Sequence, residues 1–191
     1  HALDFEGWRQ AGCEGWSYAD VLPYFKRMES YSGGADAFRG TEGPLHVQRA
    51  EATETLAQAF LEAGVQAGYQ RTDDISGYCQ EGFGVFDRTV FKGQRWSAAR
   101  AYLDPARGRK NLTIVTQALV HRLIMSSDRV TGVLYRDQQG ALVNVMARQE
   151  VLLSAGAVGS PHLLLLSGIG PKSHLEAMGI TVTADLPGVG Q

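Results

Sequence analysis

Apolar residues recur at helical spacing in the first half of the chain. Between residues 17 and 30 one helical face collects Tyr18, Val21, Leu22, Phe25 and Met28. Ser17 followed by Asp20 is the pattern of a capping box, so we expect the helix to begin there. Pro23 lacks a backbone donor, and a start at Asp20 would place it in the first turn, so this later start is an alternative.

A second helix is predicted from Thr55 to Ala67. Leu56, Phe60 and Ala63 repeat on one side of it. Thr55 and Gln58 have the spacing of a capping box, and Gly68 is placed to end the helix.

Shorter elements connect these two helices and follow them. SYSGGADAFRG is typical of an irregular, mobile loop, and the recurring glycines from Ser76 to Gly84 indicate another loop. GPLHVQ predicts a short strand, and Ser97 is placed to cap a short helix through Tyr102.

The second half of the chain changes to runs rich in β-branched and aliphatic residues. The runs are NLTIVT, LVHRLIMS, VTGVLYR and LVNVMA. The turn sequence DQQG separates the last two, so we expect antiparallel strands. EVLLSAG follows, and the continuous apolar pair Leu152 and Leu153 predicts a central strand buried on both faces.

The stretch GAVGSPHLLLLSGIG predicts a glycine turn followed by a buried helix. Gly156 and Gly159 permit a tight turn, Ser160 is an N-cap candidate and Pro161 suits the first helical position. The helix is apolar all round, which predicts burial, and Gly168 is placed to end it.

The same turn has two functional interpretations. A helix N-terminus beside a glycine turn accepts anions such as pyrophosphate. Alternatively, the glycines serve only the packing of helix on strand. GIGPKS is not a dinucleotide-binding fingerprint, because it follows a helix and has Ser173 at its sixth position. GAVGS is not a nucleophile elbow, because Val158 and His162 stand where glycines are required.

Composition narrows the class of protein. The 191 residues are 44% hydrophobic and 20% charged, with a net charge of -2, as in an ordinary globular protein. The charge gives no support to a nucleic-acid partner, and no segment is long and apolar enough to be transmembrane. Cys13 and Cys79 lack metal-ligand spacing. They are most simply free thiols in a reducing compartment, so we expect a cytoplasmic protein, although two cysteines are also enough for one bridge.

The histidines and the chain ends add two expectations. None of the five histidines has a metal-ligand spacing to another ligand residue, so we expect no metal site. The chain starts abruptly with HALDFEGW and stops on the turn LPGVGQ, so we expect a piece of a longer protein.

Taken whole, GAVGSPHLLLLSGIG resembles the second signature of the glucose-methanol-choline (GMC) oxidoreductase family. That pattern has glycine and a small residue, then Ser or Thr before Pro, aliphatic pairs and a closing Ser-Gly-aliphatic-Gly. Ten positions fit it: Gly156, Ala157, Ser160, Pro161, Leu163, Leu164, Ser167, Gly168, Ile169 and Gly170. Other segments are similar too, and GQRWSAARAYL is nearest to the choline dehydrogenase-like subgroup. Gly159 stands where that subgroup usually has Asn.

The resemblance implies an α+β fold: antiparallel strands and a buried strand-turn-helix of an incomplete FAD-binding domain, with part of the substrate-binding domain. Segment 1–41 would be a helical part of the FAD domain, 42–75 part of the substrate domain and 76–191 part of the FAD domain. The family's dinucleotide-binding βαβ unit would precede His1, and its catalytic histidine would follow Gln191. The resemblance therefore assigns no catalytic residue to this chain.

The resemblance also implies FAD as cofactor and a small alcohol as substrate. The flavin would take a hydride from the alcohol carbon while the histidine base removes the hydroxyl proton. Val120 matches the position whose backbone meets the adenine end of FAD, and Ala155 and Gly156 match the turn beside the dinucleotide. By itself the fragment would be inactive, and it would either associate with itself or hide its exposed apolar surfaces by a rearranged packing. The alternatives are a non-catalytic binding domain of the same fold and another family member, such as an aryl-alcohol, glucose or hydroxynitrile enzyme.

Overall fold

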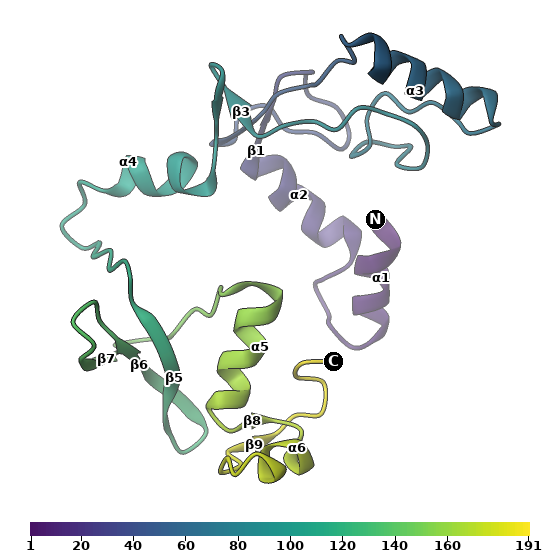
Figure 1. Ribbon diagram of the computed structural model, residues 1–191. Coiled ribbons are helices and arrows are strands. Elements are labelled where there is room, and N and C mark those ends of the chain that lie inside the picture. Colours follow the sequence, from purple (N-terminus) through teal and green to yellow (C-terminus); the bar gives the residue numbers. More distant parts are fainter. The chain divides into compact units, whose positions relative to one another are not determined.

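The computed structural model describes residues 1–191 and divides them into two compact units, His1–Leu112 and Thr113–Gln191 (Figure 1). Helices and short strands occur in both units, which confirms the predicted α+β class. The division into segments 1–41, 42–75 and 76–191 refers to a larger fold and stays a prediction.

Unit 1 carries helices and two pairs of short strands. Its elements are α1 (Ala2–Gln10), α2 (Tyr18–Met28), β1 (Glu29–Tyr31), β2 (Leu45–Val47), α3 (Thr55–Gln66), β3 (Val90–Phe91), β4 (Gln94–Arg95), the π-helical η1 (Ala99–Leu103) and α4 (Asp104–Ala106). β1 and β2 are parallel, whereas β3 and β4 are antiparallel. β2 confirms the strand predicted in GPLHVQ.

Local capping explains where α2 begins. The Ser17 hydroxyl accepts a hydrogen bond from the Asp20 amide at 3.2 Å, and the Asp20 carboxylate accepts one from the Ser17 amide at 3.0 Å. The predicted capping box is therefore present, and Pro23 lies inside the helix. α1 was not predicted. It packs on α2 through Phe5, whose ring centroid lies 5.8 Å from that of Phe25.

The start of α3 differs from the prediction. Its N-cap is Glu54, with no side-chain cap bond, so the Thr55–Gln58 capping box is wrong. The Gln58 amide group instead donates to the Ala52 carbonyl at 3.0 Å. The helix buries Leu61 and Gly64, whereas Leu56 on the predicted apolar side is 82% exposed. The helix ends at Gln66, and Gly68 follows with a φ of +91°, as the glycine stop predicted.

The region after β4 matches the prediction in part. Helical structure follows Ser97, but as η1 continued by α4 to Ala106, beyond the predicted end at Tyr102. The Arg100 amide lies 3.5 Å from the Ser97 hydroxyl, a long capping bond. Trp96 is anchored beside it, because its indole N–H donates to the Pro44 carbonyl at 2.9 Å.

Unit 2 is built on a three-stranded sheet. Its elements are β5 (Leu119–Ser126), β6 (Arg129–Arg136), β7 (Leu142–Met146), α5 (Gly156–Leu166), β8 (Ile169–Gly170), α6 (Lys172–Ala177) and β9 (Ala184–Asp185). β5, β6 and β7 pair antiparallel in that order, and β8 pairs with β9 in parallel. The DQQG turn is confirmed by the Gly140 amide, which donates to the Asp137 carbonyl at 3.1 Å.

Three expectations for this unit are wrong. NLTIVT and EVLLSAG form no strand, because neither has a ladder partner, and Leu152 is 81% exposed rather than central. No residue of α5 is fully buried, and Leu166 is 41% exposed. α5 packs mainly on β5 and β8, and these neighbours leave part of a largely apolar helix uncovered.

Candidate functional site

The segment Ser154–Ser160 contains the turn that leads into α5 and the first residues of that helix. The helix begins at Gly156 with Ala155 as N-cap, so the predicted start at Ser160 and Pro161 is wrong. The Ser160 hydroxyl instead accepts a hydrogen bond from the Ala155 amide at 3.0 Å. Pro161 lies inside the helix and has no N–H to offer the Ala157 carbonyl.

Gly156 explains this early start. Its φ of +83° turns the chain directly into the helix, a conformation that glycine adopts without strain. The predicted glycine turn is therefore confirmed at Gly156, whereas Gly159 lies inside α5 and takes no part in it. Ala155 and Gly156 are exposed, and the space beside the Gly156 Cα is open. No side chain caps the start of α5, so its first backbone N–H groups face an open approach.

The other end of the motif is buried and tightly bonded. The Ser167 hydroxyl accepts from the Leu123 amide at 2.9 Å and donates to the Leu163 carbonyl at 2.5 Å. Gly168 has a φ of +81°, and a Cβ there would collide with the Thr181 carbonyl oxygen. The Gly168 carbonyl accepts from the Thr183 amide at 2.7 Å. These bonds hold the chain at the end of α5 against β5 and against the segment that leads into β9.

Val120 lies near the start of β5, which packs against α5. It pairs with Tyr135, and the register shifts between Val120 and Arg122, so a β-bulge follows it. β5 and α5 run in the same direction (Figure 1). The structure therefore places Val120 and the turn at Ala155 and Gly156 in one unit, toward the same ends of two packed elements.

The bulge contains a polar atom that sequence reasoning did not single out. The Nε2 atom of His121 is buried and has no hydrogen-bond partner. Buried polar atoms normally have partners, so this unpaired nitrogen is a locally unfavourable feature of the strand. A histidine at an ordinary strand position gave no sequence signal for this, because the bulge arises from the pairing of β5 with β6.

Unit 1 holds a buried charge cluster that the sequence did not reveal. Arg39 is 3% exposed and bonds both oxygens of Glu29, at 2.8 and 3.0 Å. It also donates to Asp74 at 2.7 Å and lies 3.2 Å from Asp87. Its guanidinium stacks 3.6 Å from the centroid of the Tyr31 ring. One cation thus connects segments from four parts of the unit.

The pKa values of this cluster follow its burial. Burial raises the pKa of Tyr31, and the negative charges of Asp87 and Asp74 raise it further. Burial alone would lower the pKa of Arg39, but its bond to Glu29 and the surrounding carboxylates raise it. The Tyr31 hydroxyl has no hydrogen-bond partner.

The predicted loop SYSGGADAFRG is irregular only after Tyr31, because its first two residues belong to β1, and its end at Arg39 is held in place. The Asp36 carboxylate accepts from the amides of Phe38 and Arg39, both at 2.7 Å. The hydrogen bond from the Phe38 amide lowers the pKa of Asp36 most, burial opposes it, and the bond from the Arg39 amide lowers the pKa further.

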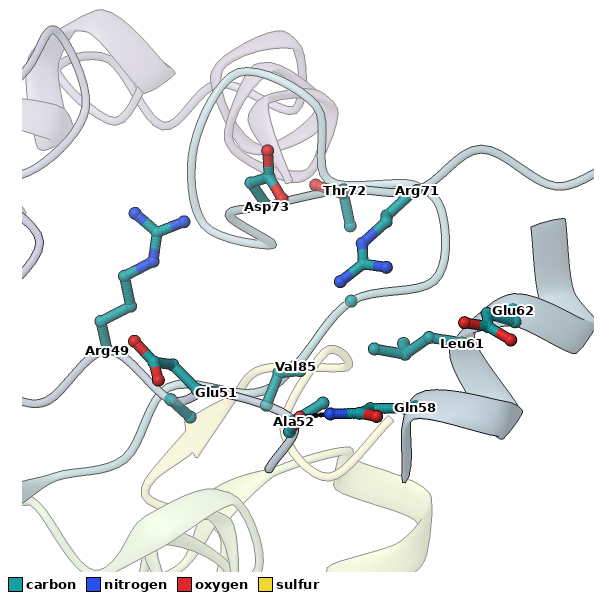
Figure 2. Close-up of a pocket in the computed structure, with 12 residues that line it drawn as sticks. Arg49, Glu51, Ala52, Gln58, Leu61, Glu62, Arg71, Thr72, Asp73 and Val85 are labelled. Atoms are coloured by element: carbon teal, nitrogen blue, oxygen red, sulfur yellow. Dashed lines mark hydrogen bonds between the residues drawn. The ribbon is translucent and has the colours of Figure 1, made fainter. Parts of the chain in front are cut away.

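Unit 1 also contains a cavity of about 550 Å³ between α3 and the loops around it (Figure 2). Leu61 and Thr72 are its buried residues. Arg49 and Arg71 line it without forming an ion pair, and the acidic residues Glu51, Glu62 and Asp73 line it too. With both signs of charge around it, the cavity does not define one charge of ligand.

Cys13 and Cys79 are exposed and unpaired, which confirms the free-thiol interpretation. No three His, Cys, Asp or Glu side chains are grouped to hold a metal ion. No helix in the structure combines the length and hydrophobicity that a bilayer crossing requires.

The fold and the Gly156–Gly170 motif define a class of protein. The family model of the GMC oxidoreductases matches residues 1–191, and the chain belongs to this family. Its sequence is 54% identical over 190 residues to oxygen-dependent choline dehydrogenase of Rhizobium johnstonii, covering 100% of this chain and 34% of that protein. The chain thus spans about a third of the length of the curated relatives that it matches.

Solved structures share the same fold. Pyridoxine 4-oxidase from Mesorbium loti is 38% identical with a TM-score of 0.84, over 98% of this chain and 37% of that one. An FAD-dependent oxidoreductase from Chaetomium thermophilum is 29% identical with a TM-score of 0.88, over 98% of this chain and 35% of that one. Both confirm the expected partial GMC fold.

Proposed function

We propose that this chain is part of an FAD-dependent oxidoreductase that oxidises a primary alcohol, with choline as substrate. The observation that carries the proposal is the match of the whole chain to the GMC family together with 54% identity to a choline dehydrogenase. When bound, FAD supplies the hydride acceptor for the alcohol carbon. This chain contributes no catalytic residue to the proposal.

The residues of this chain would hold the nucleotide with main-chain groups. The exposed turn at Ala155 and Gly156 offers open space and uncapped N–H groups, which suit a phosphate-bearing ligand. Val120 would meet the adenine end with its backbone, so its side chain is free to pack. These three roles are proposals that rest on the motif and on the open geometry of the turn.

Compartment and assembly are also proposed. Two unpaired, exposed cysteines support a reducing compartment such as the cytoplasm. Exposed apolar side chains in unit 2, including Leu152 and Val158, support self-association of the 191-residue chain.

The test uses the full-length protein that contains this chain. We expect it to purify with bound flavin, and we expect anaerobic choline to bleach the visible flavin absorption as the flavin is reduced. Pyridoxine, also a primary alcohol, is the control substrate. A protein that binds no flavin would overturn the cofactor proposal. A flavoprotein bleached by pyridoxine and not by choline would overturn the substrate proposal.

A further inference from the structure

We propose that Ser160 is a positioning residue that holds the Ala155–Gly156 turn in the shape that flavin nucleotide binding requires. The inference rests on the proposed function, because it assumes that this turn meets the nucleotide. It assigns to Ser160 a role different from helix capping.

The first observation is the direction of the hydrogen bond. An N-cap hydroxyl accepts from an amide two or three residues further along the helix. The Ser160 hydroxyl accepts from the Ala155 amide, five residues back along the chain, at 3.0 Å. The bond closes a hydrogen-bonded loop from Ala155 to Ser160 and fixes the position of Ala155, the residue before Gly156.

The second observation is that little else restrains this turn. Gly156 has a φ of +83°, and glycine explores more backbone conformations than other residues. No side chain caps α5, and Ala155, Gly156 and Ala157 are exposed. The Ala155 amide makes no backbone hydrogen bond, so the Ser160 hydroxyl is its one partner within the chain.

Pro161 adds to the need for this bond. Without an N–H, Pro161 leaves the Ala157 carbonyl out of the helical ladder, so the first turn of α5 has one bond fewer to the rest of the helix. The hydrogen bond between the Ala155 amide and the Ser160 hydroxyl supplies a restraint in its place, just before the helix begins. The adjacent Ser and Pro of the motif thus have linked roles. Pro161 removes one backbone hydrogen bond from the first turn of α5, and Ser160 holds the turn before that helix in a fixed shape.

A turn held in advance binds a ligand better, because less conformational freedom is lost on binding. The test compares Ser160→Ala, Ser160→Thr and Ser154→Ala in the full-length protein. Ser160→Thr keeps the hydroxyl, and Ser154 is an exposed neighbour that makes no side-chain hydrogen bond. Flavin affinity of the apoprotein is measured by fluorescence titration, and amide exchange of a peptide covering residues 151–160 is measured by mass spectrometry.

We expect Ser160→Ala to weaken flavin binding about threefold to tenfold, the loss of one hydrogen bond, and to speed exchange in the 151–160 peptide. Ser160→Thr and Ser154→Ala should match the parent protein in both measurements. Unchanged flavin affinity in Ser160→Ala overturns the inference, as does an equal loss in Ser160→Thr. If the parent protein itself binds no flavin, the proposed function fails instead. Faster exchange in Ser160→Ala would then still establish the bond as a restraint on the turn.

Discussion

The hydroxyl of Ser167 joins the end of α5 to the backbone of Leu123 in β5, with a hydrogen bond of 2.9 Å. Leu123 is 4% exposed, and its amide points away from β6 toward the helix. A buried amide without a partner is costly, so Ser167 of the Ser-Gly-Ile-Gly motif has a structural role as the acceptor for the Leu123 amide. It also sets the position of α5 relative to the strand that carries Val120.

Replacing Ser167 tests this connection. Ser167→Ala should lower the stability of unit 2 by about 1–3 kcal/mol, because it leaves the buried Leu123 amide unsatisfied. Ser173→Ala, at an exposed position of α6, should have no measurable effect. Amide exchange of a β5 peptide reports the change. Equal protection of β5 in both variants would show that the Ser167 bond contributes nothing.

Gly168 and Gly179 have similar φ values but different surroundings. Replacing each by alanine therefore distinguishes the cost of backbone strain from the cost of a steric clash. Gly179→Ala should cost about 1–2 kcal/mol, because its φ is +70° but its surroundings are open. Gly168→Ala combines the same strain with a collision against the Thr181 carbonyl, so it should cost clearly more. Chemical unfolding followed by far-UV circular dichroism makes the comparison. A Gly168 variant no less stable than the Gly179 variant would refute the close approach.

The Arg39 cluster should dominate the stability of unit 1. Arg39→Ala leaves three carboxylates around an empty position and should cost about 3–5 kcal/mol. Arg107→Ala removes an exposed ion pair with Asp104 and should cost less than about 1 kcal/mol. Tryptophan fluorescence during urea unfolding reports unit 1 alone, because Trp8, Trp16 and Trp96 all lie in it. Similar losses in the two variants would contradict the cluster's importance.

The raised pKa of Tyr31 predicts that the stability of unit 1 changes with pH in the alkaline range. Its pKa is raised, so its contribution to stability is complete below the ordinary tyrosine pKa and is lost as the pH rises through the folded value. Tyr31→Phe should abolish this contribution to the alkaline loss. At neutral pH it should leave stability unchanged or increase it by up to about 1 kcal/mol, because it removes an unpartnered buried hydroxyl. Urea unfolding across the alkaline range measures both, and a clear loss at neutral pH would show that the hydroxyl is satisfied.

Exposed apolar side chains predict self-association of the 191-residue chain. Leu152→Glu should shift the mass measured by light scattering toward that of the monomer. Leu152 is 81% exposed, in the segment EVLLSAG that pairs with no strand. Gln139→Glu adds the same charge in the exposed DQQG turn and should leave association unchanged. A parent chain that is monomeric at all concentrations would contradict the prediction.

Local patterns in the sequence were enough for part of this fold. The Ser17–Asp20 capping box, the DQQG turn and the stop at Gly168 depend on residues within a few positions of each other, and all three are present. The site turn was placed correctly, but the helix start was not, because Gly156 enters the helix directly with Ser160 bonded behind it.

Features that depend on distant neighbours were beyond sequence reasoning. Leu152 lies in a run typical of a buried strand, yet burial requires flanking strands that this chain does not provide. Arg39 gave no signal because Glu29, Asp74 and Asp87 come together only through the loops of unit 1. Helix and strand patterns describe the residues of one segment of the sequence, whereas these contacts form between several segments that are distant in the sequence.

The most direct test of the central claim is a crystal structure of the full-length protein with FAD bound. We predict that the main chain of Ala155 and Gly156 lies in contact with the flavin nucleotide and that Val120 meets its adenine end through backbone atoms. A cofactor bound well away from this turn would contradict the account.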